Sequence, residues 1–199
     1  MEDFNKKNIY DSDYLAQILR DGCACAFPTD TIPAIATSPD NAFKIWEIKQ
    51  RPLEKPLILM GSDIDQLFNY ISSEASSDAI QVAAKYWPGA LTIVIPSFGL
   101  PLATLNPKGK SLGMRIPNSE LARELLFKSG PLATSSANLA GSPSPRGIED
   151  VVKSFPELPL LGPIPWPSSS EMASTIIKWE EKGKWKLVRE GSCIPSEVR

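Results

Sequence analysis

Proline is the residue type that most restricts how this chain can fold. The sequence contains 19 prolines against 12 glycines. Proline lacks an amide hydrogen and has a fixed φ angle, so it is excluded from helix interiors and from central strands. The chain must therefore turn often. Hydrophobic residues make up 42% and charged residues 22% of the sequence, as in ordinary globular proteins, which excludes a disordered, collagen-like or coiled-coil main body.

The length favours a single domain. A chain of 199 residues can bury a sizeable core, and no change of composition marks a boundary, so we expect one domain over residues 1–199. The net charge of −2 argues against a general nucleic-acid binder. The polar first residues lack the apolar segment of a secretory signal, and the apolar runs are too short to span a membrane. We therefore expect a cytoplasmic protein.

The sequence contains no histidine. This excludes Ser-His-Asp and Cys-His catalysis, histidine metal sites and histidine pH switches. We therefore predict no protein metal centre. Cys23, Cys25 and Cys193 form no C-x-x-C pair. Cys23 and Cys25 alternate within an apolar run, so we expect both to be small buried side chains on one face of a strand. A redox pair is the alternative interpretation.

Apolar periodicity predicts alternating helices and strands. Gly22 ends the first helix, Ser38 and Ser62 are expected to cap later ones, and Phe43 and Trp46 are expected to face inward. The alternation indicates an α/β fold of the α+β type, and a final strand pair indicates a mixed sheet. Helices are predicted over residues 12–20, 38–49, 62–68, 77–86 and 118–128; strands over 23–27, 34–37, 57–60, 91–95, 112–116, 132–134, 174–178 and 185–188; and loops over 97–110, 139–147 and 156–170.

Polar residues gather where four of the predicted strands end. Thr29–Thr31 follow the first strand, Thr134–Asn138 continue another, and Arg115 and Arg189 lie at the ends of two more. Sheets of α/β proteins bind ligands at such strand ends. Each feature alone also fits a local turn or a surface ion pair. Four together favour a polar ligand cleft.

A basic group lies between residues 44 and 55. Lys44, Lys49, Arg51 and Lys55 are opposed there by two glutamates. A solvated helix end would explain this composition. The other interpretation is a polyanion site, because two prolines stiffen the segment and a stiff loop loses less entropy when it clamps phosphates.

These motifs, taken in order, resemble the YrdC-like family of threonylcarbamoyl-AMP synthases. The resemblance covers about residues 15 to 191. Its blocks are Pro28-Thr29-Asp30-Thr31, Lys49-Gln50-Arg51 with Lys55-Pro56-Leu57, Trp87-Pro88-Gly89-Ala90-Leu91-Thr92, Gly113-Met114-Arg115-Ile116-Pro117, Ser136-Ala137-Asn138 with Gly141 and Pro143-Ser144-Pro145, Ser174-Thr175-Ile176, and Arg189-Glu190-Gly191.

The resemblance implies a twisted mixed sheet flanked by helices, with a positively charged cavity. It also implies a nucleotidyltransferase that uses ATP with Mg²⁺, L-threonine and bicarbonate or CO2. The products are L-threonylcarbamoyl-adenylate and pyrophosphate, and a partner transferase then modifies adenosine in tRNA. An alternative is an RNA-binding or ribosome-maturation module of the same fold. A second alternative is a relative of the hydrogenase-maturation carbamoyltransferases, but the chain lacks the length and the Cys/His content for their additional regions.

The resemblance also implies residue roles. Lys49 and Arg51, as the catalytic residues, would hold the triphosphate together with Lys55. Arg115 would pair with the threonine carboxylate. The other expected binding residues surround threonine and nucleotide: Thr31, Thr92, Ser136, Asn138, Ser144, Ser174 and Arg189.

The chain departs from the family pattern after Thr31. The family continues with an apolar residue and then Tyr-Gly, whereas this chain has Ile32, Pro33 and Ala34. The tyrosine ring and hydroxyl are missing, and Pro33 also removes a backbone donor. Trp46, Trp87 and Tyr86 are the aromatic candidates to take their place, and the departure marks the chain as a divergent member.

Overall fold

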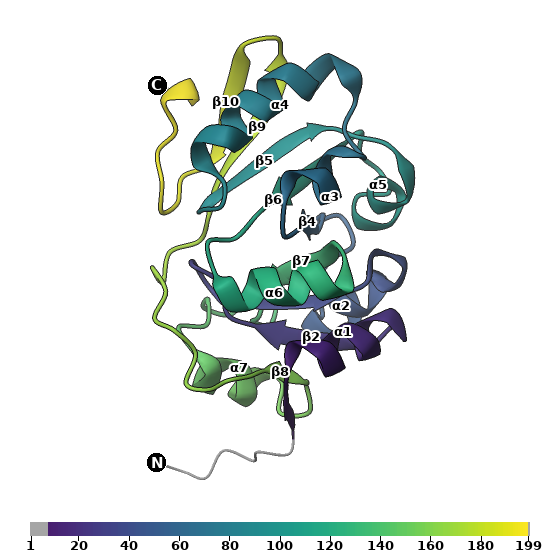
Figure 1. Ribbon diagram of the computed structural model, residues 1–199, viewed down its shortest axis with the longest axis vertical. Coiled ribbons are helices and arrows are strands. Elements are labelled where there is room, and N and C mark those ends of the chain that lie inside the picture. The colour runs from purple at the N-terminus through teal and green to yellow at the C-terminus, as the bar shows by residue number, and fades with distance from the viewer. Residues whose placement is uncertain (1–7, 199) are drawn as a thin grey trace.

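The computed structural model describes residues 8–198, which form a long mixed sheet flanked by helices (Figure 1). Within these residues the strand order is β1-β8-β2-β3-β7-β4-β6-β5-β9-β10. Parallel pairs (β1–β8, β2–β8, β4–β6, β5–β9) mix with antiparallel ones, including the final β9–β10 hairpin. This confirms the predicted mixed sheet and fold class. The strands are β1 (Ile9–Tyr10), β2 (Ala24–Phe27), β3 (Ala34–Thr37), β4 (Ile58–Met60), β5 (Leu91–Pro96), β6 (Ser111–Arg115), β7 (Leu132–Ser136), β8 (Leu160–Leu161), β9 (Thr175–Glu181) and β10 (Lys184–Arg189).

The helices begin and end where local signals place most of them. Asp11 caps α1 by accepting a hydrogen bond from the amide of Tyr14, and Ser119 caps α6 through the amide of Ala122. The helices are α1 (Ser12–Arg20), α2 (Phe43–Lys49), α3 (Ile64–Phe68), α4 (Ser73–Tyr86), α5 (Gly99–Leu105), α6 (Glu120–Ser129) and α7 (Ile148–Ser154), with 3₁₀ turns at Pro39–Asn41 and Ser196–Val198.

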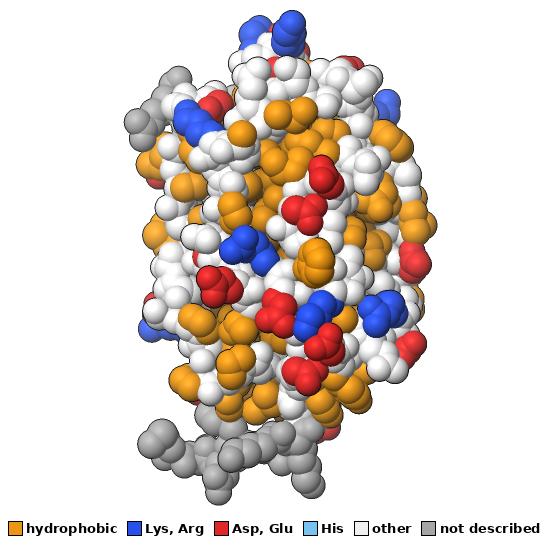
Figure 2. Space-filling model, viewed as in Figure 1, with side chains coloured by type: hydrophobic (Ala, Val, Ile, Leu, Met, Phe, Trp, Pro, Cys, Tyr) orange, Lys and Arg blue, Asp and Glu red, His pale blue; other side chains and the backbone are white. Residues whose placement is uncertain are grey.

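Two apolar clusters form the core. One lies under α1 and α6, which are side by side in Figure 1, and includes Leu15, Phe27 and Leu125. The other, larger cluster joins α2, α3 and α4 to β4, β5 and β6. On the face shown in Figure 2, acidic and basic side chains are interspersed rather than separated by sign, in keeping with the small net charge. Within residues 8–198, no helix is long and apolar enough to cross a bilayer.

The predicted helix over 38–49 is wrong in its first half. Residues 39–41 form a 3₁₀ turn instead, and the Ser38 side chain makes no capping hydrogen bond. Phe43 opens α2 and is 51% exposed, whereas Trp46 is buried as predicted. The predicted cap of the next helix is also shifted, because the Asp63 carboxylate, rather than Ser62, accepts from the Gln66 amide.

The predicted loop over 97–110 is also wrong, because it contains α5. Pro101 lies in the first turn of that helix, where its missing amide breaks no intrahelical bond. The predicted irregular stretch 156–170 contains β8, and neither β1 nor α7 was predicted. Cys25 is buried on β2 as expected, but Cys23 precedes the strand and is exposed, so the prediction that both are buried is wrong for Cys23.

Candidate functional site

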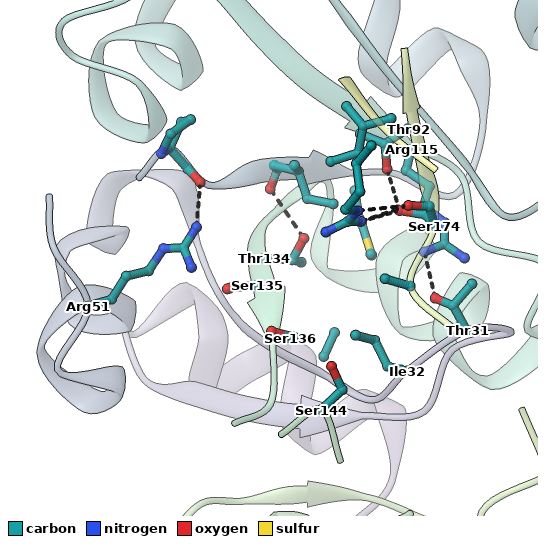
Figure 3. Close-up of a pocket in the computed structure, with 17 residues that line it drawn as sticks. Thr31, Ile32, Arg51, Thr92, Arg115, Thr134, Ser135, Ser136, Ser144 and Ser174 are labelled. Carbon is teal, nitrogen blue, oxygen red and sulfur yellow. Dashed lines mark hydrogen bonds between the residues drawn. The ribbon is translucent and has the colours of Figure 1, made fainter. Parts of the chain in front are cut away.

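A pocket of about 210 Å³ lies where β5, β6, β7 and β10 bring polar residues together and β3 and β4 add apolar ones (Figure 3). It borders the α1–α6 cluster, because Ala34 and Met60 belong to both. Its lining residues, all among those the structure describes, include three arginines and seven serines and threonines but no aspartate or glutamate. They are Thr31, Ile32, Ala34, Arg51, Pro56, Ile58, Met60, Thr92, Arg115, Thr134, Ser135, Ser136, Ser144, Ala173, Ser174, Ile176 and Arg189.

Strand pairing brings two distant loops together at this pocket. The start of β3 is antiparallel to the end of β7, with Ala34 opposite Ser136. The loop before β3 therefore meets the turn after β7, and the Ala137 amide donates to the Pro33 carbonyl at 2.9 Å. This places the hydroxyls of Thr31 and Ser136 on one cavity.

The loop before β3 is held by its own threonines. The Thr29 hydroxyl donates to the Ile32 carbonyl at 2.8 Å and accepts from the Thr31 amide at 3.1 Å. Such hydroxyl-backbone bonds replace a backbone turn. They leave Thr31 buried and directed at Arg115.

Arg115 ends β6 and is almost fully buried. Its Nη2 pairs with the Asp30 carboxylate at 2.7 Å, Nη1 donates to the Thr31 hydroxyl at 2.8 Å, and Nε donates to the Gly89 carbonyl at 2.9 Å. Burial lowers the pKa of the guanidinium, and the Asp30 charge opposes that shift. The side chain is thus oriented by three partners while it still lines the cavity.

Arg189 reaches the same cavity from β10, the edge strand. Its Nη2 donates to the Ser174 carbonyl at 2.7 Å, and the Ser174 hydroxyl lies 2.9 Å from that of Thr92. Burial lowers the pKa of Arg189. No carboxylate within residues 8–198 pairs with this guanidinium, so its charge remains available to an anion.

Arg51 lies on the opposite side of the pocket. Its guanidinium donates to the carbonyls of Lys55 at 3.3 Å and Pro56 at 3.2 Å. These contacts fold the proline-bounded segment back on itself, as a stiff clamp requires. The Lys55 side chain is exposed and does not line the pocket; that residue contributes its carbonyl instead.

Lys49, the last residue of α2, lies behind the residues that line the pocket and does not line it itself. Its ammonium donates to the Ser136 carbonyl and, at 2.5 Å, to the Asn138 carbonyl. The side-chain oxygens of Asn138 and Ser136 lie 3.4 and 3.5 Å away. Burial, and secondarily the nearby Arg51 charge, lower the pKa of Lys49 to about 8.

The structure brings most of the predicted binding residues together. Lys49 and Asn138 lie behind the wall, and Lys55 lies outside. The lining residues that were not predicted include Thr134 and Ser135, which the polar cluster at that strand end already contained, and an apolar floor without a sequence signal. The predicted residues on the lining are Thr31, Arg51, Thr92, Arg115, Ser136, Ser144, Ser174 and Arg189.

Pro33 faces away from this pocket. Ile32 and Ala34 line it, whereas Pro33 lines a second cavity with Arg146 and Trp166. The aromatic candidates to replace the missing tyrosine also lie elsewhere, because none of them is among the described lining residues. These candidates are Trp46, Trp87 and Tyr86.

The residues 8–198 contain no group of three or more histidine, cysteine, aspartate or glutamate side chains placed to hold a metal ion. The donors in the pocket are hydroxyls and guanidinium groups, which suit an anion and not a bare divalent cation. A metal ion here would have to be carried by the oxygen atoms of a bound ligand.

Comparison with known proteins gives a family match over most of the chain. Residues 17–191 match the family model Sua5_yciO_yrdC, described as "Telomere recombination". Two proteins named threonylcarbamoyl-AMP synthase, from Bacillus subtilis and Klebsiella pneumoniae, are 38% and 34% identical over 141 and 143 residues. These alignments cover 68% and 69% of this chain, and 40% and 75% of the respective relatives. The chain thus spans about two fifths of the length of the first relative.

Solved structures agree with the sequence match. The structure of Pyrococcus abyssi Sua5 complexed with L-threonine superposes with a TM-score of 0.83 at 28% identity, covering 90% of this chain and 54% of that one. YciO from E. coli superposes with a TM-score of 0.78 over 96% of this chain and 97% of its own. Its 22% identity supports the shared fold.

Proposed function

The chain belongs to the Sua5–YciO–YrdC family, and from this premise we propose that it is a threonylcarbamoyl-AMP synthase. The proposed reaction joins L-threonine, bicarbonate and ATP into L-threonylcarbamoyl-adenylate, with release of pyrophosphate and water. The observation that carries the proposal is the carboxylate-free pocket, which gathers arginines and hydroxyls from distant segments. All three proposed substrates bring an anionic group to it.

The chemical step needs positioning more than covalent help. The carbamate oxygen of N-carboxy-threonine forms a bond to the α-phosphorus of ATP, and the bond from that phosphorus to the bridging oxygen of pyrophosphate breaks. Phosphoryl and nucleotidyl transfers of this kind depend on alignment and on neutralised charge. A pocket without histidine or carboxylate on its lining can supply both through Arg51, Arg115 and Arg189.

We assign the roles by location within the pocket. Arg51 and Arg189 would contact the phosphates, since both are paired with neutral carbonyls. Arg115, oriented by Asp30 and Thr31, would receive the threonine carboxylate. Four further hydroxyls of the lining would bind threonine, ribose or phosphate: those of Thr92, Ser136, Ser144 and Ser174.

Magnesium would enter as the MgATP complex. The pocket lining provides no carboxylate to hold it, so the phosphates of ATP would carry the ion into the pocket. The adenylate product would pass to a partner transferase that acts on adenosine in tRNA. One sheet connects strands from β1 to β10, which supports the proposal of a single domain.

A pyrophosphate-release assay tests the proposal. Purified protein is incubated with MgATP and bicarbonate, with and without L-threonine, and the products are separated by chromatography. We expect threonine-dependent release together with a new adenylate peak. The matched variants are Arg189→Met in the pocket and Arg20→Met on the exposed end of α1. ATP binding without threonine-dependent turnover would refute the synthase proposal. Equal activity of both variants would refute the phosphate-binding role assigned to Arg189.

A further inference from the structure

The position of Lys49 points to a role other than holding phosphate. Resting on the proposed nucleotide site, we propose that Lys49 is a positioning residue whose protonated ammonium fixes residues 136–140 in the shape that presents Ser136 to the nucleotide. We call residues 136–140 the clamped turn. Lys49 itself does not contact the triphosphate.

Lys49 holds the clamped turn through three hydrogen bonds. Its ammonium donates to the carbonyls of Ser136 and Asn138. Its own carbonyl accepts from the Ala140 amide at 3.0 Å. Within the turn, the Ser136 hydroxyl donates to the Asn138 side-chain oxygen at 2.6 Å. One residue of α2 therefore sets both the backbone and the hydroxyl of the turn.

The clamped turn uses all the hydrogen-bond donors of the Lys49 ammonium, so none is left for a phosphate. An ammonium has three N–H donors. Four oxygen atoms of the clamped turn lie within 3.5 Å of Nζ, so every donor has an acceptor already. Lys49 is 1% exposed, and it is absent from the described lining of the pocket, whereas Ser136 and Arg51 are on it. A phosphate ligand would have to displace the turn to reach Nζ.

The hydrogen bonds from Lys49 to the clamped turn have full strength only when its side chain is protonated. A neutral amine keeps two N–H donors but has no charge, so it would hold these oxygens with fewer and weaker hydrogen bonds. Residues 136–142 contain no titratable side chain, and the charged neighbour that acts on Lys49 is Arg51, which stays protonated. The pKa of about 8 therefore places the loss of these charge-assisted bonds, and a looser clamped turn, in the mildly alkaline range.

Calorimetric titration with AMP and with MgATP separates the two roles. Lys49→Met is expected to lower the affinity for both nucleotides by the same factor, about tenfold or more. This factor corresponds to the loss of a charge-assisted hydrogen bond. If Lys49 bound a phosphate directly, its replacement would instead weaken ATP binding more than AMP binding. Lys49→Arg keeps the charge, but its planar fork does not fit the four-oxygen shell, so it should not restore affinity. Lys153→Met, on the exposed side of α7, is the control and should bind both nucleotides normally.

The pH dependence gives a second measurement that needs no variant. Wild-type affinity for AMP should fall as pH rises through about 8, and Lys49→Met should lose that dependence. A flat wild-type profile between pH 7 and about 9.5 would overturn the inference. The inference would also be overturned if Lys49→Met lost more affinity for ATP than for AMP, or if Lys49→Arg restored wild-type affinity. Failure of the wild-type chain to bind either nucleotide would refute the proposed function itself.

Discussion

Removing the charge of Asp30 is the sharpest test of how this pocket is built. The Asp30 carboxylate is 16% exposed; it pairs with Arg115 at 2.7 Å and accepts from the Asn118 amide at 3.0 Å. Asp30→Asn keeps the shape but leaves the buried guanidinium, 3% exposed, without its counter-ion. The Thr31 hydroxyl and the Gly89 carbonyl remain as acceptors.

The expected loss of stability in Asp30→Asn depends on the two acceptors that Arg115 keeps. Removing one partner of a buried ion pair costs about 3–5 kcal/mol. Because two neutral acceptors stay in place and Asp30 is partly solvated, we expect a loss just below this range, about 2–3 kcal/mol of unfolding free energy. For a chain of this length, such a loss lowers the melting temperature by about 5–10 °C.

Urea unfolding at pH 7, followed by tryptophan fluorescence, measures the loss. The matched control is Asp13→Asn, because Asp13 is 78% exposed and pairs with Lys128 at the surface. That variant should stay within about 1 kcal/mol of wild type. If Asp30→Asn were no more destabilising than Asp13→Asn, the buried ion pair would not support the pocket. The threonine affinity of Asp30→Asn should also change, because Arg115 loses its orientation.

Three further predictions concern separate parts of the chain. A Cβ at Gly191 would lie 2.2 Å from the Ala173 carbonyl oxygen and 2.5 Å from the Ser174 carbonyl carbon, so Gly191→Ala should displace Ser174 and reduce pyrophosphate release at least about tenfold; unchanged activity would contradict this close approach. Burial raises the pKa of the Cys25 thiol to about 12, so a thiol reagent at pH 8 should label exposed Cys23 in the folded protein and Cys25 after unfolding; rapid labelling of Cys25 in the folded state would be the contrary result. Because the pKa of Lys49 is lowered to about 8, the unfolded chain binds more protons than the folded one from about pH 8 to 10.5, and wild-type stability relative to Lys49→Met should rise over that window by up to about 1.4 kcal/mol per pH unit; a difference independent of pH in unfolding titrations would refute the shift.

Local signals predicted the elements that depend on local interactions. The helix over 12–20 has the predicted bounds, because an apolar stripe and a terminal glycine act within a few residues. The strand over 34–37 and the final hairpin were predicted for the same reason. In contrast, β1 and β8 have two residues each and exist through parallel pairing across about 150 residues, for which a short window contains no signal.

The side-chain partners in the site were less predictable. The sequence placed Arg115 and Asp30 in separate motifs, and their 2.7 Å contact depends on β6 ending beside the loop before β3. Both Lys49, predicted as catalytic, and Lys55, predicted as a binding residue, were expected to hold the triphosphate, but Lys49 is buried at the end of α2 and Lys55 is exposed beyond it. The direction in which a residue points depends on where its element stops, which is the least predictable feature of a sequence.

By itself, the sequence determined the mixed α/β class, the family and the residue types available for chemistry, because these follow from periodicity, ordered motifs and the absence of histidine. The tertiary structure decided which of those residues share a cavity. Pairing of β3 with β7 brought the loop that carries Thr31 next to Ser136, whereas Pro33 in that loop lines a separate cavity. The physical reason is that strand pairing joins segments that lie far apart in the sequence, and no local pattern encodes which segments pair.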